Sequence, residues 1–249
     1  MAFDFKDEVR VFMIFDILGD TLRSGPIEWA IKRERLESIK DHVFDLILMY
    51  RLLERYLPSD LNGSLVIDYL LVHDLAEAIT GDITKFGSVS DDERTRVSNI
   101  ATDYLIRKFN SVMDFCSLMI GFENKSTIEA KIASLLDSIH SATTFIKYAA
   151  EGITDIDDPD IIPELKMYQG IARERNIDLG DVFYEYHRKK LNFTDEECYR
   201  FKITREEADY IISVMTSFID EFHDQKNNST LLSVSDDFPK YATQYKRKK

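Results

Sequence analysis

Residues 72–82 read VHDLAEAITGD and place four ionisable side chains in an otherwise apolar stretch. His73 and Asp74 are adjacent, and Glu77 follows about one helical turn later. Asp82 comes directly after the glycine that is expected to end the helix. Because charged groups are costly to withdraw from water without partners, these side chains lie either on a solvated face or around a cation.

The composition is that of an acidic globular protein. The 249 residues are 44% hydrophobic and 31% charged, which allows one large domain or two small ones. A formal net charge of −13 argues against a broad surface for duplex DNA or RNA, so nucleic acid is not expected as a partner. A small phosphorylated ligand is compatible with this charge, since a metal ion or a few local cations can hold it.

The sequence lacks the features of a secreted or membrane protein. Residues 1–20 are interrupted by charges and do not follow the order of a signal peptide. No apolar run approaches the roughly 18 residues that a membrane span needs. Cys116 and Cys198 lack the paired spacing of a zinc or redox motif. We therefore expect a reduced, cytoplasmic protein that does not contact a membrane.

The spacing of apolar residues predicts an all-α protein. There are only 9 Gly and 5 Pro, and few strictly alternating runs. Capping patterns, in which Glu follows Ser or Thr by three residues, start at Ser90, Ser126 and Thr204. Residues 64–79 are apolar nearly all round, which predicts a continuous central helix. The expected helices cover residues 5–22, 37–57, 64–79, 91–110, 127–150, 163–176, 180–190, 194–202 and 204–225.

Two of these helices carry rows of apolar side chains at helical spacing, as amphipathic helices do. The row in the first helix consists of Phe5, Val9, Phe12, Phe15 and Leu22. The row in the second helix consists of Phe44, Ile47, Leu48, Leu52 and Tyr56.

Two histidines and two aspartates on predicted helices form a candidate metal site, consisting of His42, His73, Asp74 and Asp137. Imidazole and carboxylate together suit Mn²⁺, Fe²⁺, Co²⁺, Ni²⁺ or Zn²⁺. Asp137 lies in an apolar helix face, where a lone carboxylate is costly without a partner. Residue types and spacing alone leave a metal site and ordinary core or surface positions about equally open.

Three blocks of the sequence together resemble one enzyme family. Residues 73–82 fit the pattern H-D-x-x-E-x-x-x-G-D at every fixed position. Residues 35–42, RLESIKDH, fit the pattern Arg-x-Glu-[Ser/Asn]-[Val/Ile]-x-[Asp/Glu]-His. Asp137 stands in a predicted helix further downstream. In this order, and over about residues 10–150, the blocks resemble HD-domain metal-dependent phosphohydrolases, most closely their 5′-deoxynucleotidase branch.

The resemblance implies an HD-domain helical bundle with one divalent metal ion per chain, either Mn, Co, Fe, Ni, Zn or Mg. The implied ligands are His42, His73, Asp74 and Asp137. The implied reaction is hydrolysis of a (deoxy)nucleoside 5′-monophosphate to nucleoside and phosphate. Glu77 would activate or protonate at the reacting phosphate, and Asp82 would assist. Members of this branch are often homodimers, so a homodimer is expected.

The residues that contact the substrate are less clearly marked. Arg35 is favoured as the phosphate-binding cation, because it alone among the nearby basic residues falls in the matched motif. Lys85 lies in the loop after the Gly-Asp pair. The family has an Arg–Trp pair before the first His, whereas here Glu28 precedes Trp29. Trp29 is either a core anchor or a wall against the base or sugar of the substrate.

The distribution of histidines favours a mononuclear centre. Dinuclear HD phosphodiesterases use further His ligands between the His-Asp pair and the last Asp, and no His lies between Asp74 and Asp137 here. His140 comes one turn after Asp137. It either orients a metal ligand by contacting that ligand without binding the metal itself, or it is an ordinary helix residue.

We divide the chain into an HD-type core (1–152), a C-terminal helical extension packed on the core (153–226) and a polar tail with a basic end (227–249). The tail is expected to be flexible, with a basic docking arm as the alternative. The extension keeps a second enzyme hypothesis open, a deoxynucleoside triphosphate triphosphohydrolase or a hydrolase of another phosphorylated metabolite. A non-catalytic nucleotide-binding module is the third, and the retention of Glu77 and Asp82 argues against it.

Overall fold

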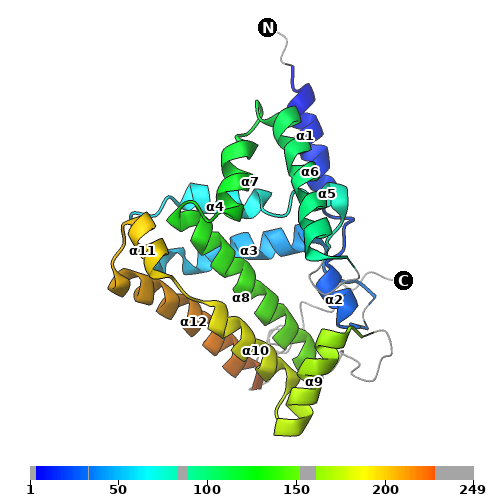
Figure 1. Ribbon diagram of the computed structural model, residues 1–249, viewed down its shortest axis with the longest axis vertical. Helices are drawn as coiled ribbons and strands as arrows, with labels where there is room; N and C mark the ends of the chain where they lie inside the picture. Colours follow the sequence, from blue (N-terminus) through cyan, green and yellow to red (C-terminus); the bar gives the residue numbers. More distant parts are fainter. Residues whose placement is uncertain (1–3, 33, 84–88, 152–160, 228–249) are drawn as a thin grey trace, which may run out of the picture.

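The computed structural model describes residues 4–32, 34–83, 89–151 and 161–227, and in these residues it is all-α, as predicted (Figure 1). None of the described helices combines the length and hydrophobicity that crossing a membrane requires. The helices are α1 (Lys6–Ile17), α2 (Ser24–Glu28), α3 (Ile39–Leu53), the 3-10 helix η1 (Glu54–Tyr56), α4 (Gly63–Val72), α5 (Glu77–Thr80), α6 (Asp91–Phe109), α7 (Phe115–Glu123), α8 (Ile128–Ala150), α9 (Pro163–Arg175), α10 (Leu179–Lys190), α11 (Asp195–Phe201) and α12 (Arg205–Asn227).

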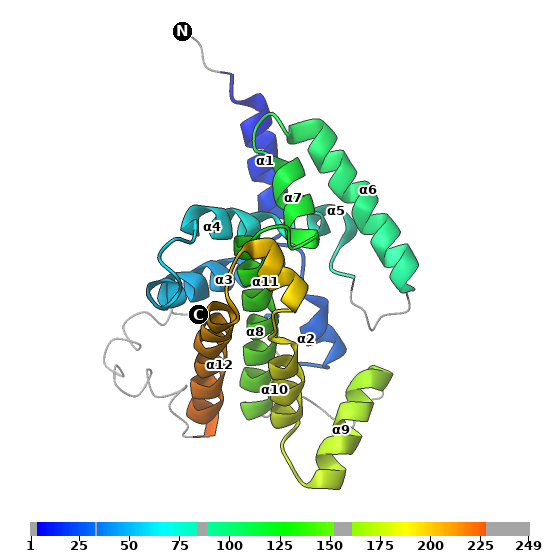
Figure 2. The same cartoon turned by 60° about the vertical axis from the view of Figure 1, so that its left-hand side comes forward.

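Helix α8 is the element around which the others pack. It contacts α3, α4, α7, α10 and α12, and Figures 1 and 2 show it running through the middle of the molecule. Its N-cap is Thr127, whose hydroxyl accepts a hydrogen bond from the Ala130 N–H at 3.1 Å. The cap predicted at Ser126 is therefore displaced by one residue, because the Ser126 hydroxyl bonds to the Gly121 carbonyl instead.

The prediction of one continuous helix over residues 64–79 is wrong. Helix α4 ends at Val72, α5 begins at Glu77, and a turn joins them. In this turn the N–H groups of Leu75 and Glu77 bond to carbonyls three residues earlier, at 3.0 and 2.9 Å. The tighter bonding redirects the side chains of residues 73–76, and no Gly or Pro within them signals the change.

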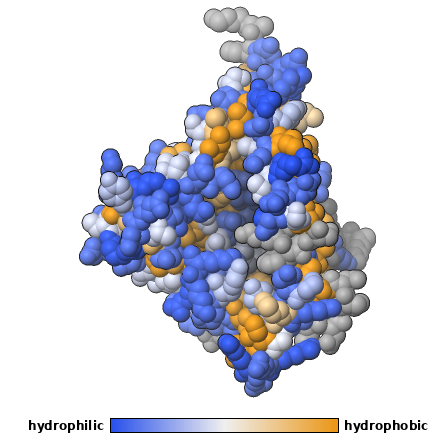
Figure 3. Space-filling view, in the orientation of Figure 1, coloured by the Kyte–Doolittle hydropathy of each residue, from blue (hydrophilic) through white to orange (hydrophobic). Residues whose placement is uncertain are grey.

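Most of the side chains in the two predicted apolar rows are exposed. Phe12 on α1 is 70% exposed and Phe44 on α3 is 65% exposed. Helix α3 buries the neighbouring face instead, which includes Val43 and Leu46. Because α3 is apolar on several sides, its periodicity does not identify the inward face. Apolar surface is visible on the upper part of the molecule, where α1 lies (Figure 3).

The C-terminal helices pack along α8. Helices α10 and α12 contact it, and α12 adds Ala208, Ile211, Met215 and Ile219 to the hydrophobic cluster that also contains residues of α3, α4 and α8. A second cluster joins α8, α9 and α10 through Phe145, Ile161, Leu165 and Phe183. The division of the chain into three parts stays a prediction, and residues 228–249 of the predicted tail lie outside the described residues.

Candidate metal centre

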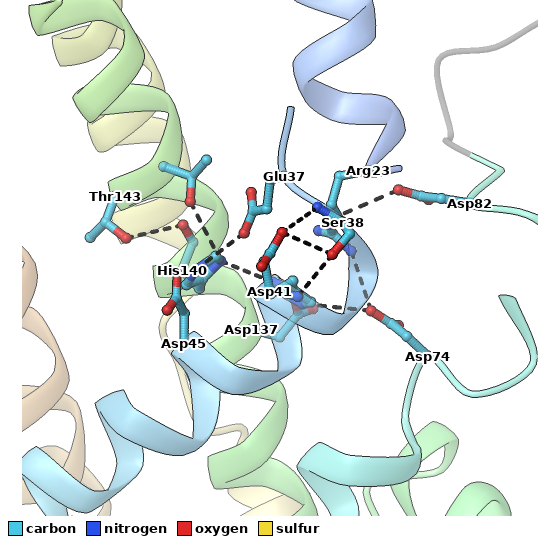
Figure 4. A network of polar contacts seen from close by, with 12 residues as sticks. Arg23, Glu37, Ser38, Asp41, Asp45, Asp74, Asp82, Asp137, His140 and Thr143 are labelled. Carbon is cyan, nitrogen blue, oxygen red and sulfur yellow. Dashed lines mark hydrogen bonds and ion pairs between the residues drawn. The ribbon is translucent and has the colours of Figure 1, made fainter. Parts of the chain in front are cut away.

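Three distant parts of the chain bring two histidines and two aspartates together. His42 comes from α3, His73 and Asp74 from the turn after α4, and Asp137 from the middle of α8. His42 Nε2 lies 3.2 Å from Asp137 Oδ1 and 3.5 Å from Asp74 Oδ2. Figure 4 shows Asp74 and Asp137 in this network of polar contacts. His73 Nε2 lies 3.0 Å from the same Asp74 oxygen. The four predicted metal ligands are therefore neighbours in the structure.

A capping box positions His42 at the start of α3. The Ser38 hydroxyl accepts from the Asp41 N–H at 3.1 Å, and the Asp41 carboxylate accepts from the Ser38 N–H at 3.0 Å. Starting the helix here places His42 in its first turn, where the ring is fully buried. The residues that precede the motif histidine thus serve to fix its direction.

The donor atoms of this cluster fit a divalent metal ion. Ligand atoms of His42, His73 and Asp137 lie within 4.8 Å of one another. Nε2 of both histidines is buried without a hydrogen bond. His73 Nδ1 lies 2.9 Å from the Leu70 carbonyl oxygen, which can only accept, so Nδ1 carries the proton and the neutral ring has its lone pair on Nε2. Two such nitrogens with two carboxylates suit a transition-metal ion.

For His42, Asp74 and Asp137, the electrostatics of the cluster favour the ionisation states of metal ligands. Burial and the nearby Arg23 lower the pKa of His42 to about 3, so its ring is neutral. Burial acts to raise the pKa values of Asp74 and Asp137, but the neighbouring histidines and Arg23 outweigh it and both shift downward. For His73, burial is outweighed by Asp74 and Asp137, and its pKa rises to about 8. A bound cation would displace that proton.

Arg23 and two further carboxyl groups complete the site. Arg23 Nη1 donates to Asp74 Oδ2 at 3.2 Å, and its Nε lies 4.0 Å from Asp82 Oδ2. Asp82 Oδ2 also accepts from the Ser24 N–H at 2.8 Å, which ties this segment to the end of α5. Burial together with Asp74 and Asp82 raises the pKa of Glu77 well above its usual value. Glu77 is therefore a carboxyl group able to hold a proton beside ionised aspartates.

The predicted substrate residues lie in other places. Arg35 is 79% exposed at its side chain and pairs with Asp41 at 2.7 Å. Trp29 packs edge-on against Phe145 and Phe183, at ring-centroid distances of 4.8 and 5.9 Å, which is the geometry of a core anchor. Lys85 lies outside the described residues.

Sequence reasoning missed Arg23. The expected signal was an Arg directly before Trp29, and Glu28 stands there. Arg23 instead follows Leu22, which forms an isolated bridge with Ser38 next to the start of α3. This pairing of distant backbone segments, which no spacing rule reveals, brings the arginine to the site.

A cavity of about 660 Å³ opens from the cluster. His73, Glu77 and Asp137 line it together with parts of α5, α6 and α7. Its lining also includes the polar residues Arg94, Thr95, Ser98, Asn99, Asn124 and Lys125. A ligand in this cavity would meet both the cluster and many hydrogen-bonding groups.

Comparison with known proteins agrees with this geometry. Residues 15–159 match the model of the HD domain family. The chain is 28% identical over 135 residues to the 5′-deoxynucleotidase HDDC2 of Xenopus laevis, covering 53% of this chain and 66% of that protein. It is 27% identical over 144 residues to the 5′-deoxynucleotidase YBR242W of Saccharomyces cerevisiae, covering 55% and 58%. It is 31% identical over 137 residues to the 5′-deoxynucleotidase hdd1 of Schizosaccharomyces pombe, covering 53% and 67%.

These matches span about two thirds or less of the relatives' own length. Among solved structures, a predicted metal-dependent phosphohydrolase from Magnetospirillum magnetotacticum aligns with a TM-score of 0.49 and 15% identity, covering 89% of this chain and 93% of that chain. The family model covers more than half of this chain and includes every residue of the cluster. The chain therefore belongs to the HD domain family.

Proposed function

We propose that this protein is a metal-dependent phosphohydrolase that converts deoxynucleoside 5′-monophosphates to deoxynucleoside and phosphate. The observation that carries the proposal is the convergence of His42, His73, Asp74 and Asp137, of which His73 and Asp137 also line a cavity with many polar side chains. The relatives named above as 5′-deoxynucleotidases support the choice of substrate class. The homodimer and the cytoplasmic location expected from the sequence stay predictions.

The four clustered side chains would hold one divalent ion, with Mn, Fe, Co, Ni, Zn and Mg all compatible with nitrogen and oxygen donors. Such an ion lowers the pKa of bound water and polarises a phosphoryl oxygen. Asp74 contributes through Oδ2, which lies within 3.5 Å of Nε2 of both histidines. Because Asp137 also lines the cavity, the centre is open toward the space that a substrate would occupy.

Glu77 is the proton donor in this proposal. Its Oε2 is buried without a hydrogen bond, and Glu77 lines the cavity beside His73. Burial together with Asp74 and Asp82 raises its pKa well above the usual value, which favours the protonated form of the carboxyl. The proton would pass to the 5′-oxygen of the nucleoside as a water molecule forms a new bond to phosphorus and the bond between phosphorus and the 5′-oxygen breaks, and the proton that the water releases would restore the acid form of Glu77.

Arg23 is the phosphate-binding cation in this proposal, in place of Arg35. Its guanidinium is mostly buried and lies against Asp74, whereas Arg35 is exposed and occupied by Asp41. Asp82 holds the Arg23 segment through the Ser24 N–H, and this contact is the assistance that we assign to Asp82. A fixed guanidinium fork matches the geometry of phosphate oxygens.

A phosphate-release assay tests the proposal. With Mn²⁺, Co²⁺, Mg²⁺ or Zn²⁺ added, the protein is expected to release phosphate from deoxynucleoside 5′-monophosphates, and His73→Ala is expected to release none. Tripolyphosphate from a deoxynucleoside triphosphate, without turnover of monophosphates, would contradict it and favour a triphosphohydrolase. Nucleotide binding without turnover in any of the four ions would favour a non-catalytic module.

A second prediction follows from the different roles proposed for Asp74, which binds the metal ion, and Glu77, which donates a proton. Asp74→Ala should lose the bound ion, because it removes a ligand, whereas Glu77→Gln should keep the ion and lose activity by about 100-fold or more. Metal content by elemental analysis and kcat with a monophosphate check both. Glu206→Gln, an exposed position on α12, is the control. Full activity of Glu77→Gln would rule out its role as proton donor.

The choice between the two arginines gives a third prediction. Arg23→Lys keeps the charge but loses the guanidinium fork, and KM for the monophosphate is expected to rise about tenfold, since a charge-assisted hydrogen bond contributes roughly 1.5 kcal/mol. Arg35→Lys is the matched control and should change KM by less than about twofold. If steady-state kinetics show a larger rise in KM for Arg35→Lys than for Arg23→Lys, Arg35 rather than Arg23 is the phosphate-binding cation.

A further inference from the structure

A second polar cluster lies behind the proposed metal centre. It consists of Glu37, His42 and His140, and none of these three residues lines the cavity. His140 is only 5% exposed and lies one turn after Asp137 on α8. Its Nδ1 lies 2.9 Å from His42 Nδ1, and its Nε2 lies 3.6 Å from Glu37 Oε1 (Figure 4). The cluster therefore touches the ligand His42 on the side away from the centre.

The position of the protons follows from the role of His42. A ring that binds metal through Nε2 carries its proton on Nδ1, so His42 Nδ1 is the donor in the contact with His140. His140 Nδ1 must then accept, which fits the Thr144 hydroxyl that lies 3.5 Å from the same nitrogen and is able to donate to it. The proton of a neutral His140 is therefore on Nε2.

Glu37 places a carboxylate oxygen near the other ring nitrogen of His140. Its side chain is mostly buried, and its Oε1, which has no hydrogen bond, is the atom 3.6 Å from His140 Nε2. Asp45 Oδ2 lies at the same distance, but the Asp45 side chain is 54% exposed. At this distance the buried Glu37 oxygen supports His140 electrostatically rather than through a hydrogen bond.

We infer that His140, supported by Glu37, is a positioning residue that fixes the tautomer and direction of the metal ligand His42. This inference rests on the proposed metal centre. Metal-binding histidines usually donate their second ring N–H to a carboxylate or carbonyl, and here a second histidine occupies that place. Because α8 carries both Asp137 and His140, one helix supplies a ligand and also orients another ligand from α3.

The alternative for the second cluster is a second metal ion among its three residues. Such an ion would use His42 Nδ1 while the first ion uses Nε2. That arrangement requires His42 to lose both ring protons, whereas a hydrogen bond at 2.9 Å requires only a neutral ring. A hydrogen bond between His42 and His140 therefore requires less deprotonation of His42 than a second metal ion would, and we favour it.

Co²⁺ binding to the metal-stripped full-length protein tests the inference without measuring activity. His140→Leu is expected to weaken Co²⁺ binding by about 10- to 100-fold, because His42 loses its orienting acceptor. His140→Asn is expected to restore most of the affinity, since its Oδ1 takes the place of the accepting Nδ1. His223→Leu is the matched control, because it removes a histidine that contacts Asp181 on another helix.

The Co²⁺ titration has three outcomes that would overturn the inference, and each has a different meaning. Wild-type affinity in folded His140→Leu would overturn the inference while leaving the metal centre intact. Two Co²⁺ ions per wild-type chain, with one lost in His140→Leu, would overturn it in favour of the second metal site. No Co²⁺ binding by the wild-type protein would overturn the metal centre and this inference together.

A measurement on the unaltered sequence covers the case in which His140→Leu does not fold. In ¹⁵N NMR of the Zn²⁺-loaded protein, His42 is expected to be protonated on Nδ1 and His140 on Nε2. A proton on Nδ1 of His140 instead would contradict the inference, because that nitrogen could no longer accept from His42.

Discussion

The repulsion among the carboxyl groups around Glu77 is the constraint on which the rest of the structure depends. Asp74, Asp82 and Asp137 act electrostatically on Glu77, and Arg23 is a cation that acts on all four carboxyl groups. Withdrawing such a group from water is favourable only when opposite charge compensates it. Arg23 and the raised pKa of Glu77, which favours its neutral form, supply part of this compensation, and a divalent ion held by Asp74 and Asp137 would supply the rest.

The side chains of the cluster come from three different structural positions, namely the first turn of a helix, a tight turn and the middle of a helix. His42 stands in the first turn of α3, directed by the capping box of Ser38 and Asp41. His73 and Asp74 occupy a tightened turn rather than a helix, which brings their side-chain atoms to 3.0 Å. The remaining proposed ligand, Asp137, comes from the middle of α8, which α10 and α12 contact. These two C-terminal helices thus support the helix that carries Asp137.

The sequence predicts the all-α class, most helix limits and the set of candidate ligands, because capping residues and ordered motifs are local signals. It does not predict Arg23, whose approach depends on a bridge between Leu22 and Ser38. The apolar row in the predicted helix over residues 37–57 also does not identify the buried face of α3, since that helix is apolar on several sides. For Trp29 the sequence leaves two roles open, and the contacts with Phe145 and Phe183 favour the core. The position of Arg23, the buried face of α3 and the role of Trp29 all depend on contacts between residues that are far apart in the sequence.

Anomalous diffraction from crystals of the protein grown with Co²⁺ or Mn²⁺ tests the central claim most directly. The account predicts a single peak within roughly 2.0–2.2 Å of Nε2 of His42 and His73 and of a carboxylate oxygen of Asp74 and Asp137. It also predicts that Glu77 stays outside the coordination sphere. A peak bound to Glu37 and His140, or crystals with no peak among the four ligands, would contradict it.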